Sequence, residues 1–449
     1  MNRLFIVDPS LKDLRGHHFM MTHGATTSAL EHNFSVYWFV SGDFEVARSD
    51  EIPDGATAIP CFDQTMYGNP TTKPQALADT SGRGPRTPIG WLYRKLAASQ
   101  KKEKSSAPDY AIPFATALLE AFRKYEVSSA DRVLFHTADG MIFRALEHVV
   151  RKLPQKDCPV FHVATPYDPM GTMPNRKSAQ EVTDVIARLD RLDLLEKKVF
   201  LYGENEYLAQ HLSALWLTFV RPLPVPATAA EQEVVEEARI FRKETLGVKE
   251  DELLVVSLGA ARQEKGFDLT PAIIRSCYEE LGRRGLSDQK VKFAIQASPQ
   301  IIGRTALMAK VVDQLKAFDA PAIHVAEDHF STTTYQYYLH AADCILMPYD
   351  EKAYRVRSSG IVTEALQAGK IIVAKSGSYP AVLANEFGGV VGRNGLEIGR
   401  RIAALVNELE SNRVMVKNKS QVFQEINSKT DYIGICLNAE TTKQSSLKN

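Results

Sequence analysis

The chain of 449 residues is longer than one hydrophobic core usually organises, so its length predicts at least two domains. A hydrophobic content of 44% and a charged content of 24% are typical of a water-soluble globular protein, and zero net charge gives no reason to expect nucleic-acid binding. The five cysteines show no CxxC spacing, which favours buried thiols in a reducing compartment over disulfides or a metal site.

The N-terminal residues predict a buried strand rather than an export signal. Apolar residues 4–7 form a run too short for a signal peptide, and no apolar run in the sequence reaches membrane-spanning length. We therefore expect a cytoplasmic protein, with peripheral attachment to the inner membrane surface left open.

A glycine-containing loop follows this strand and leads into a helix expected over residues 16–31. Loops at this position of a doubly wound sheet commonly face a ligand, so Gly16, His17 and His18 are candidates for lining a substrate cleft. The alternative is that both histidines are ordinary loop residues. Adjacent side chains on a helix point in different directions, so the pair does not predict a metal site.

Residues 62–108 interrupt the pattern, because they are rich in Pro, Gly, Ser and Thr and show no periodicity. Within residues 83–104, seven basic residues stand against the single acid Glu103, and Trp91 and Tyr93 lie among them. This combination suits contact with a membrane surface, near an acceptor carried on an anionic lipid. A flexible, solvated loop is the alternative. The basic residues are Arg83, Arg86, Arg94, Lys95, Lys101, Lys102 and Lys104.

Two polar residues follow a strand expected over residues 132–136. His136 and Asp139 lie at or just beyond its carboxyl end, where a side chain can face a cleft. We take His136 as the first candidate for a catalytic group and Asp139 as the second, with a buried structural role as the alternative for His136. Further strands are expected at 34–40, 160–164 and 199–202, with helices at 112–124 and 205–217.

The segment Pro222-Leu-Pro-Val-Pro226 is an extended, rigid connection. We place the domain boundary there, with a first domain over residues 1–221, a second over 222–428 and a tail over 429–449. The polar tail is expected to cross back to the first domain, and residues 441–449 are expected to be disordered.

Strands and helices alternate through the second domain, which predicts a doubly wound α/β sheet. The loop after its first strand carries Arg262 and Lys265 between two glycines, and Lys265 can reach a phosphate as a point charge. The expected strands are 253–258, 291–297, 323–326, 344–347 and 371–374.

The stretch 343–377 is typical of a βαβ unit, with its loop at the carboxyl end of a strand, where open α/β sheets bind ligands. Its chemistry suits a diphosphate: residues 358–360 present backbone N–H groups at a helix start, and Arg357 lies just upstream. Glu364, one turn into the helix, can bind the two ribose hydroxyls of a nucleotide. The alternative is a carboxylate that only favours the helix dipole.

This stretch resembles the donor site of retaining glycosyltransferases of the GT-B fold, of the large family-4 type. The resemblance rests on Asp343-Cys-Ile-Leu-Met-Pro348 and Glu364-Ala-Leu-Gln-Ala-Gly369, with an Arg-Ser-Ser-Gly loop between them. The family usually carries two glutamates separated by seven residues. Glu364 matches the second, whereas Val356 stands in place of the first.

The resemblance extends to the first loop of the second domain and covers the N-terminal half only loosely. Lys265-Gly266 matches the Lys-Gly pair of the family. Ala260 stands at the family's arginine position, and Arg262 follows two residues later.

The resemblance implies two Rossmann-like domains that face each other across a cleft. It implies a metal-independent, retaining transfer of a sugar from a nucleotide diphosphate sugar to a saccharide, lipid-linked or polysaccharide acceptor, with no cofactor besides the donor. His136 and the Gly16 loop would then border the sugar. The residues implied to bind the donor are Arg262, Lys265, Arg357, Ser358, Ser359, Gly360 and Glu364. A non-catalytic nucleotide-sugar-binding or scaffold module and a nucleotide-sugar epimerase fit the same architecture.

Overall fold

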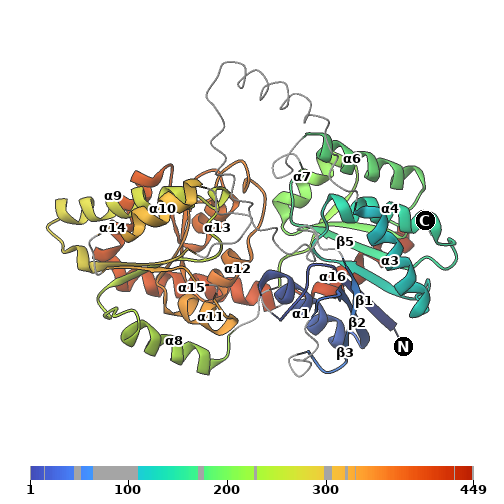
Figure 1. The fold of residues 1–449 in the computed structure, drawn as a ribbon, viewed down its shortest axis with the longest axis horizontal. Coiled ribbons are helices and arrows are strands. Elements are labelled where there is room, and N and C mark those ends of the chain that lie inside the picture. Colours follow the sequence, from blue (N-terminus) through green and yellow to red (C-terminus); the bar gives the residue numbers. More distant parts are fainter. Residues whose placement is uncertain are drawn as a thin grey trace, which may run out of the picture.

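The chain forms two parallel sheets, each flanked by helices, which lie side by side as two lobes (Figure 1). Both termini lie on the lobe that contains the first sheet (Figure 1). The computed structural model describes residues 2–14, 16–44, 52–63, 110–169, 176–226, 230–297, 306–318, 322–328, 330–428 and 430–446.

The first sheet has seven strands in the order β3-β2-β1-β4-β5-β6-β7, and neighbouring strands run parallel. Its strands are β1 Asn2–Asp8, β2 Phe34–Ser41, β3 Ala56–Phe62, β4 Arg132–Phe135, β5 Val160–Thr165, β6 Val199–Gly203 and β7 Val220–Pro222. The described helices of this lobe that precede β7 are α1 Gly16–Glu31, α3 Ala111–Lys124, α4 Gly140–Lys152, α6 Arg176–Arg191 and α7 Glu206–Trp216.

The second sheet has six strands in the order β10-β9-β8-β11-β12-β13, also parallel. Its strands are β8 Leu253–Ser257, β9 Val291–Gln296, β10 Ile323–Ala326, β11 Cys344–Met347, β12 Ile371–Lys375 and β13 Val390–Gly392. Helices α8 to α11 are Gln232–Glu244, Thr270–Arg283, Ala306–Lys316 and Thr332–Ala341. Helices α12 to α16 are Gly360–Gln367, Tyr379–Phe387, Gly395–Leu405, Leu409–Ser428 and Tyr432–Ser446.

Helices cover both faces of each sheet, which explains why the strands are continuous apolar runs rather than alternating ones. Strand β5 is buried at every position. On the first sheet, α3, α4, α6 and α7 bury one face, while α1 and α16 bury the other. On the second, α9, α10 and α14 bury one face, and α11, α12 and α13 the other. The carboxyl ends of the strands are left as the edge at which loops gather.

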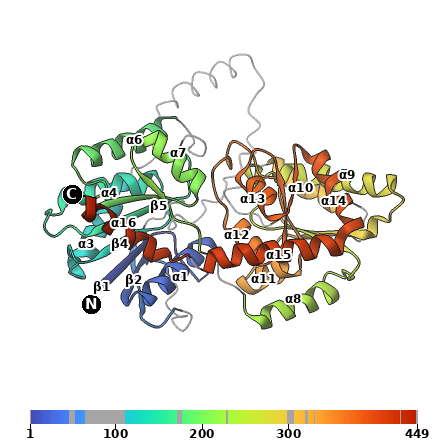
Figure 2. The same ribbon diagram turned by 180° about the vertical axis from the view of Figure 1, so that it is seen from behind.

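The C-terminal helix α16 belongs to the first lobe although it follows the last strand of the second. Figure 2 shows α15 lying along the second lobe and α16 continuing onto the first. Glu440 of α16 binds Arg132 at 2.8 Å and His162 at 3.1 Å, and Cys436 is buried against the first sheet. The expectation that residues 441–449 are disordered is wrong for residues 441–446, which continue helix α16 to Ser446.

The basic insertion expected to contact a membrane, residues 83–104, lies outside the described residues. Among the helices that are described, none combines the length and the apolar character needed to cross a bilayer.

Candidate functional site

Two loops of the second domain meet at the carboxyl ends of β8 and β11. Gly266 has a left-handed backbone (φ +67°), and a Cβ there would lie 1.9 Å from the carbonyl oxygen of Pro348. Asp350 N–H donates a 2.9 Å hydrogen bond to the carbonyl of Glu264. The loop after β8 therefore sits directly on the loop after β11, and only glycine permits the close approach at position 266.

Lys265 reaches across this junction. A Cβ on Gly259 (φ +95°) would lie 2.7 Å from its Nζ, so the absent side chain at 259 leaves room for the ammonium group. The Nζ lies 5.7 Å from the ring centre of Tyr349. Burial, together with the charges of Arg262 and Arg357, lowers the pKa of Lys265 to about 7. The buried site therefore disfavours the charged form of Lys265, which an anion beside it would favour.

Three cations surround one carboxylate at this junction, and we call them the cation cluster: Arg262, Lys265 and Arg357. Glu264 Oε1 lies 3.1 Å from Arg262 Nη1 and 3.9 Å from Arg357 Nη1. Arg262 Nε is buried and makes no hydrogen bond within the described part of the chain. A buried donor without an acceptor is costly, so the site suits an anionic ligand that can fill this place.

Helix α12 begins beside the cation cluster. Gly360 is its first residue, Ser358 is buried, and the Ser359 hydroxyl lies 3.5 Å from that of Tyr349. The amino end of a helix presents free N–H groups and partial positive charge, both favourable to phosphate. The residues expected to hold a diphosphate are therefore brought together.

Glu364 faces α11 from the first turns of α12. Its Oε2 accepts a hydrogen bond from the Tyr335 hydroxyl, and burial together with this carboxylate raises the pKa of that hydroxyl well above its usual value. Tyr335 therefore stays a hydrogen-bond donor. The hydrogen bond from Tyr335 orients the Glu364 carboxylate beside the start of α12.

Residues 355–357 contact the first domain. Val356 packs against the core formed by α3, α4, α6 and α7, and its carbonyl accepts a 2.9 Å hydrogen bond from Asn205 Nδ2. Arg355 lies 3.6 Å from Asp168. Arg357 stacks on Tyr167 of the first domain at 5.1 Å and on Tyr354 at 4.9 Å. The position at which the resembling family carries its first glutamate is a domain contact in this chain.

A second polar group occupies the carboxyl ends of β1 and β4. His18 Nδ1 lies 2.7 Å from Asp8 Oδ2, and His136 Nε2 lies 2.8 Å from Thr22 Oγ1 and 3.5 Å from Asp8 Oδ2. Although burial opposes ionisation, the contact with His18 and the charge of His136 lower the pKa of Asp8 to about 2. His136 is fully buried, and its Nδ1 contacts the Thr137 hydroxyl, so it supports the loop rather than lining open cleft surface.

The remaining candidates of the first domain lie at the starts of α4 and α1. Asp139 caps α4 by accepting a 3.0 Å hydrogen bond from Ile142 N–H, and burial raises the pKa of its carboxyl group. Gly16 begins α1 with φ +71°, and His17 follows in its first turn. His18 is partly exposed, and its Nδ1 lies 2.7 Å from Asp8 Oδ2.

Sequence reasoning missed several groups that complete the site. Glu264 could have been found from the sequence, because an acidic residue between Arg262 and Lys265 in one loop indicates a charge interaction with them. Asp8 at a strand end carried a similar signal. Tyr335 and Asn205 carried none, since their partners are 29 and 151 residues away in the sequence.

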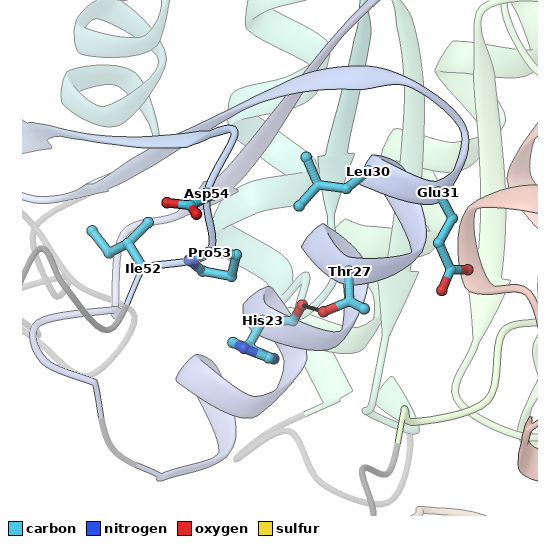
Figure 3. Close-up of a pocket in the computed structure, with 7 residues that line it drawn as sticks. All are labelled: His23, Thr27, Leu30, Glu31, Ile52, Pro53 and Asp54. Carbon is cyan, nitrogen blue, oxygen red and sulfur yellow. Dashed lines mark hydrogen bonds between the residues drawn. The ribbon is translucent and has the colours of Figure 1, made fainter.

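A hollow on the first domain shares no residue with the cation cluster. It lies between α1 and residues 52–54, as Figure 3 shows, with the Thr27 hydroxyl bonded to the His23 carbonyl at 3.1 Å. Its lining residues are His23, Thr27, Leu30, Glu31, Ile52, Pro53 and Asp54.

No protein-family model matches the sequence, and no curated protein matches it either. Solved structures share its fold. Sucrose-phosphate synthase from Thermosynechococcus elongatus gives a TM-score of 0.64 at 11% identity, covering 99% of this chain and 100% of that one. HepE from Anabaena, in complex with UDP and glucose, gives 0.60 at 11% identity over 100% and 99% of the two chains. A glycosyltransferase from Rickettsia africae gives 0.58 at 12% identity over 96% and 98%.

These likenesses extend over both domains but at identities that show the fold alone. Two parallel sheets with flanking helices, matched along their whole length by such structures, define the GT-B fold. The architecture expected from the sequence is confirmed.

Proposed function

We propose that this protein is a retaining glycosyltransferase that moves a sugar from a nucleoside diphosphate sugar to a saccharide, lipid-linked or polysaccharide acceptor. The observation that carries the proposal is the cation cluster at the amino end of α12, with Glu364 one turn into the same helix. Phosphates and ribose of one nucleotide are separated by about the distance that one helical turn covers, so a single ligand can engage both.

Similar structures support a nucleotide sugar as the donor. HepE was solved with UDP and glucose, and an E. coli structure of the same fold was solved with UDP-2-fluoro glucose. That this chain also binds a nucleotide sugar is part of the proposal. The sugar and the acceptor are left open, because the first-domain loops that would meet the acceptor carry no recognisable motif.

The leaving diphosphate would be stabilised by the chain's own charges. Arg262, Lys265 and Arg357 supply positive charge, and the first N–H groups of α12 supply oriented dipoles. We therefore propose that transfer proceeds without a bound metal ion, so that a chelator leaves the rate unchanged.

A second function follows from Val356. Because this residue docks onto the first domain instead of presenting a carboxylate, the chain has lost one polar contact that the resembling family directs at the site. A non-catalytic module that binds a nucleotide sugar would keep the cation cluster and Glu364 but would not turn over.

The test is release of nucleoside diphosphate from glucose esters of UDP, GDP, ADP and dTDP in the presence of saccharide acceptors, with the product anomer read by NMR. Loss of a charge-assisted hydrogen bond costs about 1.5–3 kcal/mol, so Arg357→Ala should lower kcat/KM by about 10- to 100-fold. Arg393→Ala is the control, because this arginine is 83% exposed and pairs with Glu397 on α14.

Acceptor-dependent release with retained configuration supports the transferase. Nucleotide binding without release under every donor and acceptor pair supports the module. Interconversion of the donor sugar without an acceptor would identify an epimerase.

A further inference from the structure

Glu264 lies beside the cation cluster, with its side chain 40% exposed. Its carboxylate lies 3.1 Å from Arg262 and 3.9 Å from Arg357, and its charge also acts on Lys265. The backbone is fixed by the 2.9 Å hydrogen bond from Asp350 N–H to its carbonyl. A diphosphate that binds the cluster therefore arrives beside a fixed negative charge.

The charges match one ligand better than its product. With all members ionised, three cations and one carboxylate leave two positive charges. Each phosphate of a nucleoside diphosphate sugar carries one negative charge. The terminal phosphate of a free nucleoside diphosphate has a second pKa of about 6 and carries nearly one charge more at about pH 8. With Glu264 present, the net charge of the cluster therefore equals the negative charge of the donor. The released diphosphate carries nearly one negative charge more than the cluster neutralises.

We infer that Glu264 sets the preference of the diphosphate site for the nucleotide sugar over the free nucleoside diphosphate, an inference that rests on the proposed function. Its charge repels the extra charge that appears when the sugar leaves. The residue favours product release, a step that limits the turnover of many enzymes. Glu264 acts on the ligand through charge and through the two arginines, and it is a specificity-determining residue.

The test is calorimetric titration at about pH 8 of wild type and Glu264→Gln with UDP, GDP, ADP and dTDP and with their glucose esters. Glutamine keeps the size of the side chain and can still accept a hydrogen bond from Arg262, so the substitution isolates charge. We expect the variant to bind the cognate nucleoside diphosphate about tenfold more tightly and its glucose ester about threefold more tightly, so that selectivity falls about threefold.

Two further variants serve as controls. Glu351→Gln removes the same charge from the neighbouring loop, where Glu351 lies 3.6 Å from Lys375, and should leave both affinities unchanged. Glu264→Asp retains the charge and should keep the wild-type ratio. The pH dependence of the same ratio provides an independent measurement: as the terminal phosphate loses its proton between about pH 5.5 and pH 8, the ratio should shift towards the free diphosphate less in wild type than in Glu264→Gln. Lys265 is present in both proteins, so the comparison between wild type and Glu264→Gln isolates the charge at position 264.

An unchanged or increased selectivity in Glu264→Gln, with wild type still binding nucleotides, overturns this inference and leaves the proposed function standing. Equal weakening of both ligands would show that Glu264 only holds the arginines in place, and overturns it as well. If none of the eight ligands binds wild type, the proposed function fails and the inference falls with it.

Discussion

The Asn205 side-chain amide joins the two domains by donating a 2.9 Å hydrogen bond to the Val356 carbonyl. Its oxygen meanwhile caps α7 by accepting from Leu208 N–H at 2.9 Å. One side chain therefore couples the start of a first-domain helix to the loop that leads into α12. This contact places Val356 against an apolar core and accounts physically for the absence of a carboxylate at that position.

Introducing the missing carboxylate should destabilise the protein rather than improve it. Val356→Glu would press a charge against the first-domain core, and burying a polar group without a partner costs about 1–3 kcal/mol. We expect the free energy of unfolding in denaturant to fall by this amount. Val356→Ile, which keeps the apolar contact, should change stability little. A Val356→Glu variant that is as stable as wild type and binds donor more tightly would refute the docking role.

The carboxylate of Glu364 should confer a preference for ribose. If it accepts hydrogen bonds from both ribose hydroxyls, wild type should bind UDP more tightly than 2′-deoxy-UDP by about one hydrogen bond, roughly 1 kcal/mol or fivefold. Glu364→Ala should abolish this preference. Tyr335→Phe removes the donor that orients the carboxylate and should reduce it. Equal affinities for the two nucleotides in wild type would contradict the assignment.

Binding of a diphosphate should be accompanied by proton uptake at Lys265. Its pKa is lowered to about 7 by burial and the two arginines, and a bound anion favours the charged form. Affinity should therefore fall as pH rises through about 7. Calorimetry at about pH 8 in buffers of different ionisation enthalpy should detect the uptake in wild type and not in Lys265→Arg. Uptake of the same number of protons by wild type and Lys265→Arg would contradict the assignment of the uptake to Lys265.

The lowered pKa of Lys265 makes the stability of the fold rise with pH, whereas it makes the affinity for a diphosphate fall. An unfolded chain holds the Lys265 proton up to about pH 10, so between about pH 7 and 10 it binds more protons than the folded state. The contribution of this group to the free energy of unfolding should rise with pH across that window. The rise should disappear in Lys265→Met, measured by denaturant titration at several pH values.

The C-terminal helix should contribute to the stability of the first domain. Glu440 joins Arg132 and His162 in a largely buried contact, so Glu440→Gln should cost about 1–3 kcal/mol. Glu410→Gln is the matched control, because its side chain is 82% exposed in a pair with Arg413. Equal stabilities of the two variants would mean that the contact of Glu440 with Arg132 and His162 adds nothing to stability.

Much of the fold followed from the sequence, because buried parallel strands are apolar runs with clear ends. Convergence of Lys265, Arg357 and Glu364 could be anticipated for the same reason, since the carboxyl ends of neighbouring parallel strands share an edge. Strand β3 was less readable: it is an edge strand that contains Pro60 and borders the irregular insertion.

Other features depend on tertiary contacts that no local pattern encodes. Helix α16 has its apolar residues in its first turns and ends in a polar run. Its sequence alone therefore predicts a tail, because these apolar residues become part of a core only through contact with the first sheet. His136 reads equally well as a cleft residue or a buried one, and only the packing of α1 over its ring decides between them. The contact of Val356 could not be predicted from the local sequence either, because its partner Asn205 lies in the other domain.

The proposed function requires that the junction of β8, β11 and α12 binds a nucleoside diphosphate. This binding can be measured by thermal unfolding with UDP, GDP, ADP and dTDP, on wild type, Glu364→Ala and the exposed control Glu410→Ala. At a hundredfold excess over Kd, binding adds about 2.7 kcal/mol. One nucleotide should therefore raise the Tm of wild type and the control by several degrees, and that of Glu364→Ala much less. An unchanged Tm with all four nucleotides would contradict the account.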